Sequence, residues 1–255
     1  MTPSTNPHPP STGSRALALF GATRGVGRCV LRKALADGHT VRALVRDASR
    51  LDRAVRDLPE TAKSRLVPVF GDVLHDEAVQ KTLEGAGAVL CALGASARNR
   101  DQIRTRGTAA LVRGMKAGGI DRIVAVTVLG AHESRDPLPW WLRNVVFPLL
   151  LAPAIADHEG QEEVLRASGL RWTAVRPPNL TDGPATNTYA AGDLDFSTVK
   201  MTVSRQDVAA FMLDVIERDA FVTETPAICD RKARYRSSKP PHSPGRSGPG
   251  RLGPS

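Results

Sequence analysis

Cysteine is scarce in this sequence, and its three copies stand far apart. Cys29, Cys91 and Cys229 form no C-x-x-C pair, so the sequence has neither the spacing of a zinc site nor that of a disulfide framework. Cys29 falls in a predicted helix and Cys91 in an apolar run, which is typical of buried thiols in a reducing compartment. We therefore expect free thiols and no metal.

Long hydrophobic runs are also missing. The N-terminus has no apolar core of the kind that a signal peptide has. The most apolar stretch, residues 139–153, is interrupted by Arg143 and Pro148 and is shorter than the roughly 20 residues that a membrane span requires. We expect a cytoplasmic protein without a membrane span, in which residues 139–153 pack on the domain.

Acidic residues are missing from the C-terminal end of the chain, which is strongly basic. The formal net charge is +9, but residues 231–255 hold seven basic residues and no acidic ones, which leaves +2 for residues 1–230. Residues 1–14 and 231–255 have too few apolar side chains to offset the cost of ordering the chain. We predict two disordered tails around one domain at residues 15–230, and no specific nucleic-acid partner. The basic tail is interpreted as a solvated appendage, with RNA or acidic lipid as the alternative.

Within residues 15–230, short apolar runs alternate with helical patterns. The runs are nearly continuous in Val, Ala, Leu and Ile, which is typical of parallel strands buried on both faces. This alternation predicts an α/β fold, a Rossmann-type doubly wound parallel sheet, with a small C-terminal region that covers the substrate. The predicted strands are 16–20, 41–45, 66–70, 88–92, 122–127 and 172–175, and the predicted helices are 26–36, 77–83, 101–117, 158–167 and one that Ser204 caps and that continues to Ile216.

The first predicted strand ends in the turn Gly21-Ala-Thr-Arg-Gly-Val-Gly27. A glycine turn between a strand and a helix brings backbone amides close to a pyrophosphate, and the helix N-terminus adds a partial positive charge. We interpret Gly21 as the residue that permits the turn, Gly25 as the point where the backbone approaches phosphate, and Gly27 as the residue that lets the helix pack on the strand. A merely structural turn is the alternative, because the spacing is not G-x-G-x-x-G.

The end of the second predicted strand indicates which dinucleotide binds. Many NAD-binding proteins place an acid there, which accepts hydrogen bonds from the ribose hydroxyls. Here Arg46 occupies that place, Arg50 follows one turn later, and Arg24 lies within the glycine turn. Guanidinium groups bind a 2′-phosphate, which a carboxylate would repel. The sequence therefore predicts NADP, and NAD is the less favoured alternative, which Asp47 would serve if the strand ended one residue later.

Two further strand ends fit the same cofactor. Asp72, after the third strand, is placed to accept a hydrogen bond from the adenine amino group, and Gly94, after the fourth, lets the backbone pass close to a ribose. Both lie at the carboxyl ends of parallel strands, where open sheets bind ligands.

These motifs resemble, in type and order, those of the atypical short-chain dehydrogenase/reductases, in particular the NmrA-like proteins and the biliverdin reductase B or flavin reductase type. The resemblance covers about residues 16–217. It rests on GATRGVG, ALVRDASRL, GDV, ALG, GMKAGGIDRIVAVT, DHEGQEEVLRASGLRWTAVRPPNLTDGP and VSRQDVAAFML.

The resemblance implies that NADPH binds in an extended groove and that its hydride passes to a small planar acceptor, such as a flavin or a tetrapyrrole. It places Thr127 beneath the nicotinamide. The cofactor contacts that it implies are Gly21, Thr23, Arg24, Gly25, Val26, Arg46, Arg50, Asp72, Val73, Leu93 and Gly94, with Pro177, Pro178 and Asn179 at the carboxamide.

Tyrosine is the residue whose scarcity limits the chemistry most. Many short-chain reductases use a Tyr-x-x-x-Lys pair, whose phenol donates a proton beside the hydride site. Of the two tyrosines here, Tyr189 has Asp193 four residues on, and Tyr235 precedes Lys239 in the basic tail, a match that we interpret as coincidence.

Few other residues are candidates for a role in the chemical step beside the nicotinamide. Val128 stands where flavin reductase relatives carry Ser, and His158 where other members carry Lys. His158 is either a proton donor near neutral pH or a polar residue that opens a helix. Trp140 and Trp141 either stack on a planar acceptor or pack as core or lid.

The absence of a strong protein acid disfavours ketone or alcohol chemistry. Hydride transfer to a flavin or a conjugated bilin depends mainly on positioning, because solvent can supply the proton. The first hypothesis is therefore an NADPH-dependent oxidoreductase that acts on a small planar acceptor. The alternatives are a non-catalytic NADP-binding regulator like NmrA, and a quinone- or sugar-modifying enzyme of the same fold. The oligomeric state stays open, a monomer included.

Overall fold

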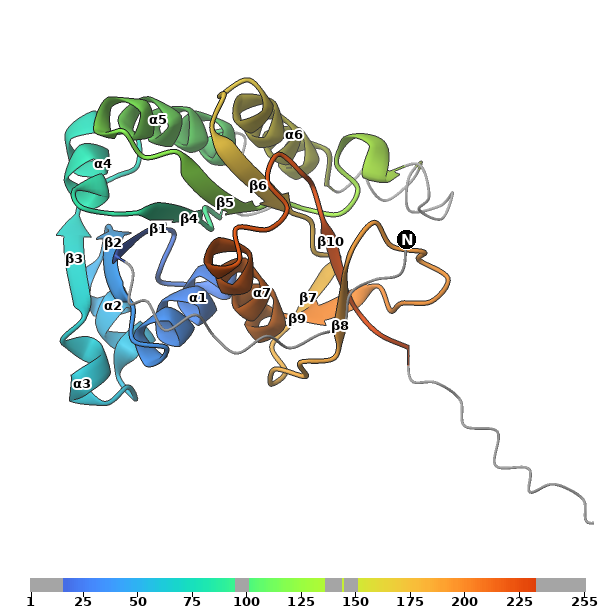
Figure 1. Ribbon diagram of the computed structural model, residues 1–255, viewed down its shortest axis with the longest axis horizontal. Helices are drawn as coiled ribbons and strands as arrows, with labels where there is room; N and C mark the ends of the chain where they lie inside the picture. The colour runs from blue at the N-terminus through green and yellow to red at the C-terminus, as the bar shows by residue number, and fades with distance from the viewer. Residues whose placement is uncertain (1–15, 95–100, 136–143, 145–150, 233–255) are drawn as a thin grey trace, which may run out of the picture.

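Six short apolar segments pair side by side into one parallel sheet (Figure 1). The strand order is β3-β2-β1-β4-β5-β6, and the order reverses between β1 and β4. Side chains of β4 and β5 are buried throughout, as expected for strands covered on both faces. The structure thus confirms the Rossmann-type doubly wound sheet. The strands are β1 (Ala16–Phe20), β2 (Thr40–Val45), β3 (Leu66–Phe70), β4 (Ala88–Cys91), β5 (Arg122–Val126) and β6 (Arg171–Val175).

The computed structural model describes residues 16–94, 101–135, 144 and 151–232. The predicted N-terminal tail, nearly all of the predicted C-terminal tail, and both tryptophans of the segment 139–153 lie outside the described residues. Arg231 still pairs with Val199, and Lys232 donates its amide hydrogen to Thr198, so regular backbone contacts continue two residues past the predicted boundary at 230.

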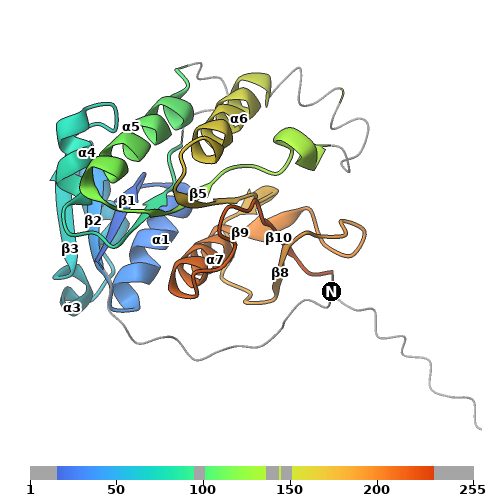
Figure 2. The same cartoon turned by 45° about the horizontal axis from the view of Figure 1, so that its top comes forward.

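Helices cover both faces of the sheet (Figure 2). Successive side chains of a strand point to opposite faces. Leu17 and Leu19 of β1 accordingly pack in one apolar cluster with α1 and α7, while Ala18 and Phe20 pack in the other with α4 and α5. The first face carries α1 (Gly25–Ala36), α2 (Ala48–Val55), α3 (Glu60–Lys63) and α7 (Arg205–Glu217), and the second carries α4 (Asp76–Leu83), α5 (Ile103–Gly118) and α6 (Ala152–Arg166).

A smaller layer stands beside β6, and we call it the C-terminal layer (Figure 1). It consists of two two-stranded sheets, β7 (Asn179–Thr181) with β9 (Thr202–Ser204) and β8 (Tyr189–Gly192) with β10 (Ala227–Asp230). Asp207 ties this layer to α7, since its carboxylate accepts hydrogen bonds from the amides of Thr186 and Asn187 and from the hydroxyl of Ser204. Although burial alone would raise its pKa, these hydrogen bonds hold the pKa of Asp207 below its usual value.

The predicted strands agree with the structure within a residue at each end, whereas some helices were missed. The cap of α7 is confirmed, because the Ser204 hydroxyl accepts from the Asp207 amide, and the helix buries Val208, Phe211, Met212 and Ile216. The predicted helix at 158–167 begins six residues earlier, at Ala152, because Pro153 fits the first turn of a helix. The helices α2 and α3 and the strands of the C-terminal layer were not predicted, since all of them are short.

No helix in the described part of the chain is long and apolar enough to cross a membrane.

Gly27 allows α1 to pack closely against the end of β1, and a substitution at this position tests that role. A Cβ at Gly27 would overlap the carbonyl group of Gly21, so we expect Gly27→Ala to lower stability by about 1–3 kcal/mol despite the better helix propensity of alanine. Gly118→Ala is the matched control, since its Cβ would meet nothing nearer than 4.0 Å at the end of α5. Thermal unfolding followed by circular dichroism measures both. Equal midpoints for Gly27→Ala and the wild type would contradict the expected overlap.

Candidate functional site

A groove of about 520 Å³ crosses the carboxyl ends of the strands, where the strand order reverses. The turns after β1, β2, β3 and β4 form its walls, and α5, α6 and the start of α7 close it. Most of the predicted site residues meet there. Those that line the groove are Gly21, Thr23, Arg24, Gly25, Val26, Arg46, Arg50, Asp72, Val73, Leu93, Gly94, Thr127 and His158.

The glycine turn presents backbone donors to this groove. Gly21 has a φ of +90°, and a Cβ there would overlap the carbonyl of Ala92 at the end of β4. The next helix, α1, begins at Gly25, and no side chain caps its first turn. The first amides of a helix have no partner within it, so this end of α1 is suited to bind an anion.

The second turn, after β2, places two guanidinium groups at the mouth of the groove. The strand ends at Val45, so Arg46 follows it directly; its side chain is 63% exposed, and its Nη1 lies 3.6 Å from Oδ2 of Asp72. Arg50 lies 3.2 Å from Asp47. Asp47 itself caps α2: its carboxylate accepts from the Ser49 hydroxyl at 2.8 Å and from the Arg50 amide at 3.2 Å. These hydrogen bonds lower the pKa of Asp47, and its carboxylate is engaged by the helix.

Thr127, directly after β5, supplies a hydrogen-bond acceptor at the end of the groove away from Arg46 and Arg50. Its side chain is nearly buried, and its hydroxyl donates to Oε1 of Glu162 at 2.9 Å. A hydroxyl has one hydrogen and two lone pairs. Because the hydrogen points at a carboxylate, the oxygen presents lone pairs to the groove and accepts hydrogen bonds there.

His158 lies beside Thr127 in the groove, but as a neutral ring. Burial, with the nearby charge of Arg104, lowers the pKa of His158 to about 3. Its Nδ1 is buried and has no hydrogen-bond partner in the described structure. A pKa this low disfavours a proton-donor role near neutral pH in the ligand-free protein, and that role stays a prediction. The other interpretation, a residue that opens a helix, is wrong, since α6 begins at Ala152.

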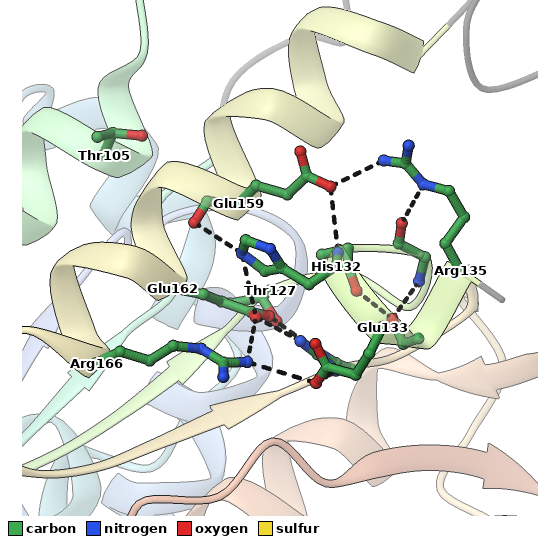
Figure 3. A network of polar contacts seen from close by, with 12 residues as sticks. Thr105, Thr127, His132, Glu133, Arg135, Glu159, Glu162 and Arg166 are labelled. Atoms are coloured by element: carbon green, nitrogen blue, oxygen red, sulfur yellow. Dashed lines mark hydrogen bonds and ion pairs between the residues drawn. The ribbon is translucent and has the colours of Figure 1, made fainter.

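Behind Thr127 lies a network of charged side chains that the sequence did not reveal (Figure 3). Glu162 of α6 is fully buried and receives two hydrogen bonds from Arg176, of 2.9 and 2.5 Å. Arg176 also donates to Glu133 of the 3₁₀ helix η1 (His132–Arg135) at 2.8 Å. This contact outweighs burial and lowers the pKa of Glu133 to about 2. Removing one partner of a buried ion pair is costly, so Glu162 is fixed, and it fixes the Thr127 hydroxyl.

Pro177, Pro178 and Asn179, in the turn after β6, do not line the groove, whereas the next residue, Leu180, does. Asn179 is exposed in β7, where it pairs with Thr202 of β9. A contact of these three residues with the carboxamide stays a prediction.

Arg104 and Arg205 also line the groove, and no local sequence motif marks either residue. Arg104 lies 3.1 Å from Asp157 of α6, and Arg205 is the first residue of α7, far along the chain from the turns after β1 to β4. Among the described residues, no cluster of His, Cys, Asp and Glu could hold a metal ion.

A family model described as NAD(P)H-binding matches residues 21–219, which include the glycine turn, the groove and α7. The chain belongs to this NAD(P)H-binding family. Among curated proteins, it is 26% identical over 226 residues to the photosystem II assembly factor Ycf39 of Synechocystis, a match that covers 84% of this chain and 62% of that protein. The chain spans between about a third and three fifths of the length of the curated relatives that it matches first.

Solved structures share the fold of this NAD(P)H-binding chain. One is ChuY, an anaerobilin reductase from Escherichia coli O157:H7, with a TM-score of 0.68 and 24% identity over 88% of this chain and 99% of that one. Another is a short-chain dehydrogenase/reductase from Veillonella parvula in complex with NADP, with a TM-score of 0.69 and 17% identity over 84% of this chain and 94% of that one. At these identities, the likeness shows the fold.

The neutral state of His158 can be measured directly. Because its pKa lies near 3, we expect the ring signals of His158 in the ligand-free protein to remain those of a neutral imidazole from pH 8 to pH 5. Nitrogen-15 NMR of the histidine rings reports this, and the signal that disappears in His158→Gln identifies the residue. A midpoint between pH 6 and 7 would restore the proton-donor interpretation.

Proposed function

We propose that the protein is an NADPH-dependent oxidoreductase that passes a hydride to a small planar acceptor, a flavin or a related conjugated compound. The observation that carries this proposal is the order of groups along one groove. In the order of the strands, exposed guanidinium groups at Arg46 and Arg50 follow β2, uncapped helix amides at Gly25 follow β1, and a hydroxyl acceptor at Thr127 follows β5. The 2′-phosphate, the pyrophosphate and the nicotinamide carboxamide of NADP are groups of matching chemistry in the same order.

The 2′-phosphate would lie between Arg46 and Arg50. Both side chains are partly exposed, and each has an acidic neighbour that a phosphate can replace, Asp72 for Arg46 and Asp47 for Arg50. Asp47, the residue that would bind ribose hydroxyls, is occupied as the cap of α2. This arrangement supports NADP over NAD.

Thr127 and His158 would orient the reacting groups. The lone pairs of Thr127 accept a hydrogen bond from an amide such as the nicotinamide carboxamide, which fixes the face of the ring. Nδ1 of His158 is buried without a hydrogen-bond partner in the described structure, so a ligand group that reaches it would give it a hydrogen bond or take one, according to the tautomer of the ring. When bound, NADPH supplies the hydride, and water supplies the proton to the reduced acceptor. Because Glu162, which contacts the Thr127 hydroxyl, is fully buried and paired with Arg176, it is not available as a proton donor, and acceptors that need a strong protein acid are disfavoured.

The alternative function is that of a non-catalytic NADP-binding regulator. Two observations favour it: His158 is neutral, and a relative is named for its part in assembling a larger complex. Neither observation removes the groove beside Thr127, where an acceptor would have to stack.

Turnover separates the two functions. We expect the purified protein to oxidise NADPH, followed at 340 nm, in the presence of FMN, riboflavin, a quinone or a bilin, and Thr127→Val to lower the rate by about tenfold, since one neutral hydrogen bond is lost. Binding of NADPH, measured by calorimetry on the same samples, is the control. Tight binding without turnover on any acceptor would support the regulator instead.

Cofactor preference tests the ribose end separately. We expect the double variant Arg46→Ala, Arg50→Ala to lose about 10- to 100-fold in NADPH affinity, because charge-assisted hydrogen bonds to the 2′-phosphate are lost, while its NADH affinity changes little. Arg53→Ala removes a charge from the same helix outside the groove and is the matched control. An equal loss for both dinucleotides would show that these residues do not bind the 2′-phosphate.

A further inference from the structure

Arg205 is a charge in the groove to which the proposed function assigns no role. It is the first residue of α7 and belongs to the side of the groove that borders the C-terminal layer. We infer that Arg205 binds the pyrophosphate of the dinucleotide and gives up Asp182 to do so, which couples cofactor binding to the C-terminal layer. This inference rests on the proposed function only in that a dinucleotide must bind.

The position of Arg205 fits a phosphate contact. Its Nε lies 4.0 Å from where a Cβ of Gly25 would stand, so its guanidinium faces the first turn of α1 from across the groove. Gly25 and the amides that follow it are the uncapped donors of that turn. A phosphate bound to them would therefore lie within reach of Arg205, whereas Arg46 and Arg50 stand at the end of another strand.

The present partner of Arg205 is one that a phosphate can replace. Its Nη1 lies 2.8 Å from Oδ1 of Asp182, but the Asp182 side chain is 91% exposed, and that of Arg205 is 26% exposed. Ion pairs with so exposed a carboxylate contribute little to stability, because water screens them. A phosphate offers the guanidinium two oxygens in a bidentate geometry and stronger hydrogen bonds.

The backbone of Arg205 is held firmly while its side chain is exchangeable. Thr181 pairs with Ser204 at the end of the β7–β9 sheet, and Asp182 and Arg205 are the residues that follow them. Ser204 caps α7, so the Arg205 backbone is fixed at the helix start. The loop after Asp182 is bound further on, where Thr186 donates to Asp207. The Ala185 amide donates to Gln206 of α7, so exchange of Asp182 for phosphate frees only the short stretch 182–184 and does not disturb α7.

Affinities for both dinucleotides test the inference. We expect Arg205→Gln to weaken NADPH and NADH by the same factor, about 10- to 100-fold, because both carry the pyrophosphate. Arg205→Lys keeps the charge and should stay within a few fold of the wild type. Asp182→Asn removes the competing carboxylate and should bind at least as tightly as the wild type. Arg218→Gln removes an arginine that is paired with Asp214 at the other end of α7, and it should change nothing.

The outcomes separate this inference from the proposed function. Wild-type affinity in Arg205→Gln, or a loss confined to NADPH, overturns the assignment of Arg205 and leaves the proposed function intact. Weaker dinucleotide binding in Asp182→Asn, together with a lower melting temperature in both Asp182→Asn and Arg205→Gln, would show that the ion pair is structural. That result would overturn the assignment of Arg205 as well. A wild-type protein that binds neither dinucleotide overturns both.

Discussion

The site depends on the close contact between two glycines, Gly21 at the end of β1 and Gly27 in the first turns of α1. Neither position has room for a side chain, since Gly21 faces the carbonyl of Ala92 and Gly27 faces the carbonyl of Gly21. This contact seats the N-terminus of α1 directly over the point where the strand order reverses. The helix amides, the end of β4 and the mouth of the groove are all placed by it. The two glycines are thus required because they have no side chain, which lets the backbone segments come into direct contact.

The reacting end is organised in a different way, by buried charge. Glu162 and Arg176 neutralise each other beneath Thr127, and Glu133 binds the remaining donors of Arg176 from η1. Such a pair adds little net stability, because two charges must be desolvated to form it. The pair instead orients the Thr127 hydroxyl. The hydroxyl hydrogen points at Glu162, so the oxygen is left to act as a hydrogen-bond acceptor toward the groove. The polar character of the groove at Thr127 is in this way set by residues that lie behind it.

The parts of the site that the sequence predicted are those with a local cause. Glycines between a strand and a helix, and arginines directly after a strand, act through their own backbone, so their spacing alone located them. Glu162, by contrast, sits on α6 among other polar residues, and only the fold buries it against Arg176. Burial and the charge of Arg104 on α5 lower the pKa of His158, and both depend on how α5 and α6 pack. Asn179 lies in β7, whose partner strand β9 begins more than twenty residues later in the chain.

Asp47 connects the choice of cofactor with the integrity of the fold. Its carboxylate is the one group at the end of β2 that could bind ribose hydroxyls, yet α2 uses it as a cap, and Ser49 shares it. If this carboxylate bound the ribose hydroxyls of NAD, α2 would therefore lose its cap. Cofactor choice and the stability of α2 therefore both depend on Asp47. A lineage that used this carboxylate for a cofactor would first have to stabilise α2 by other means.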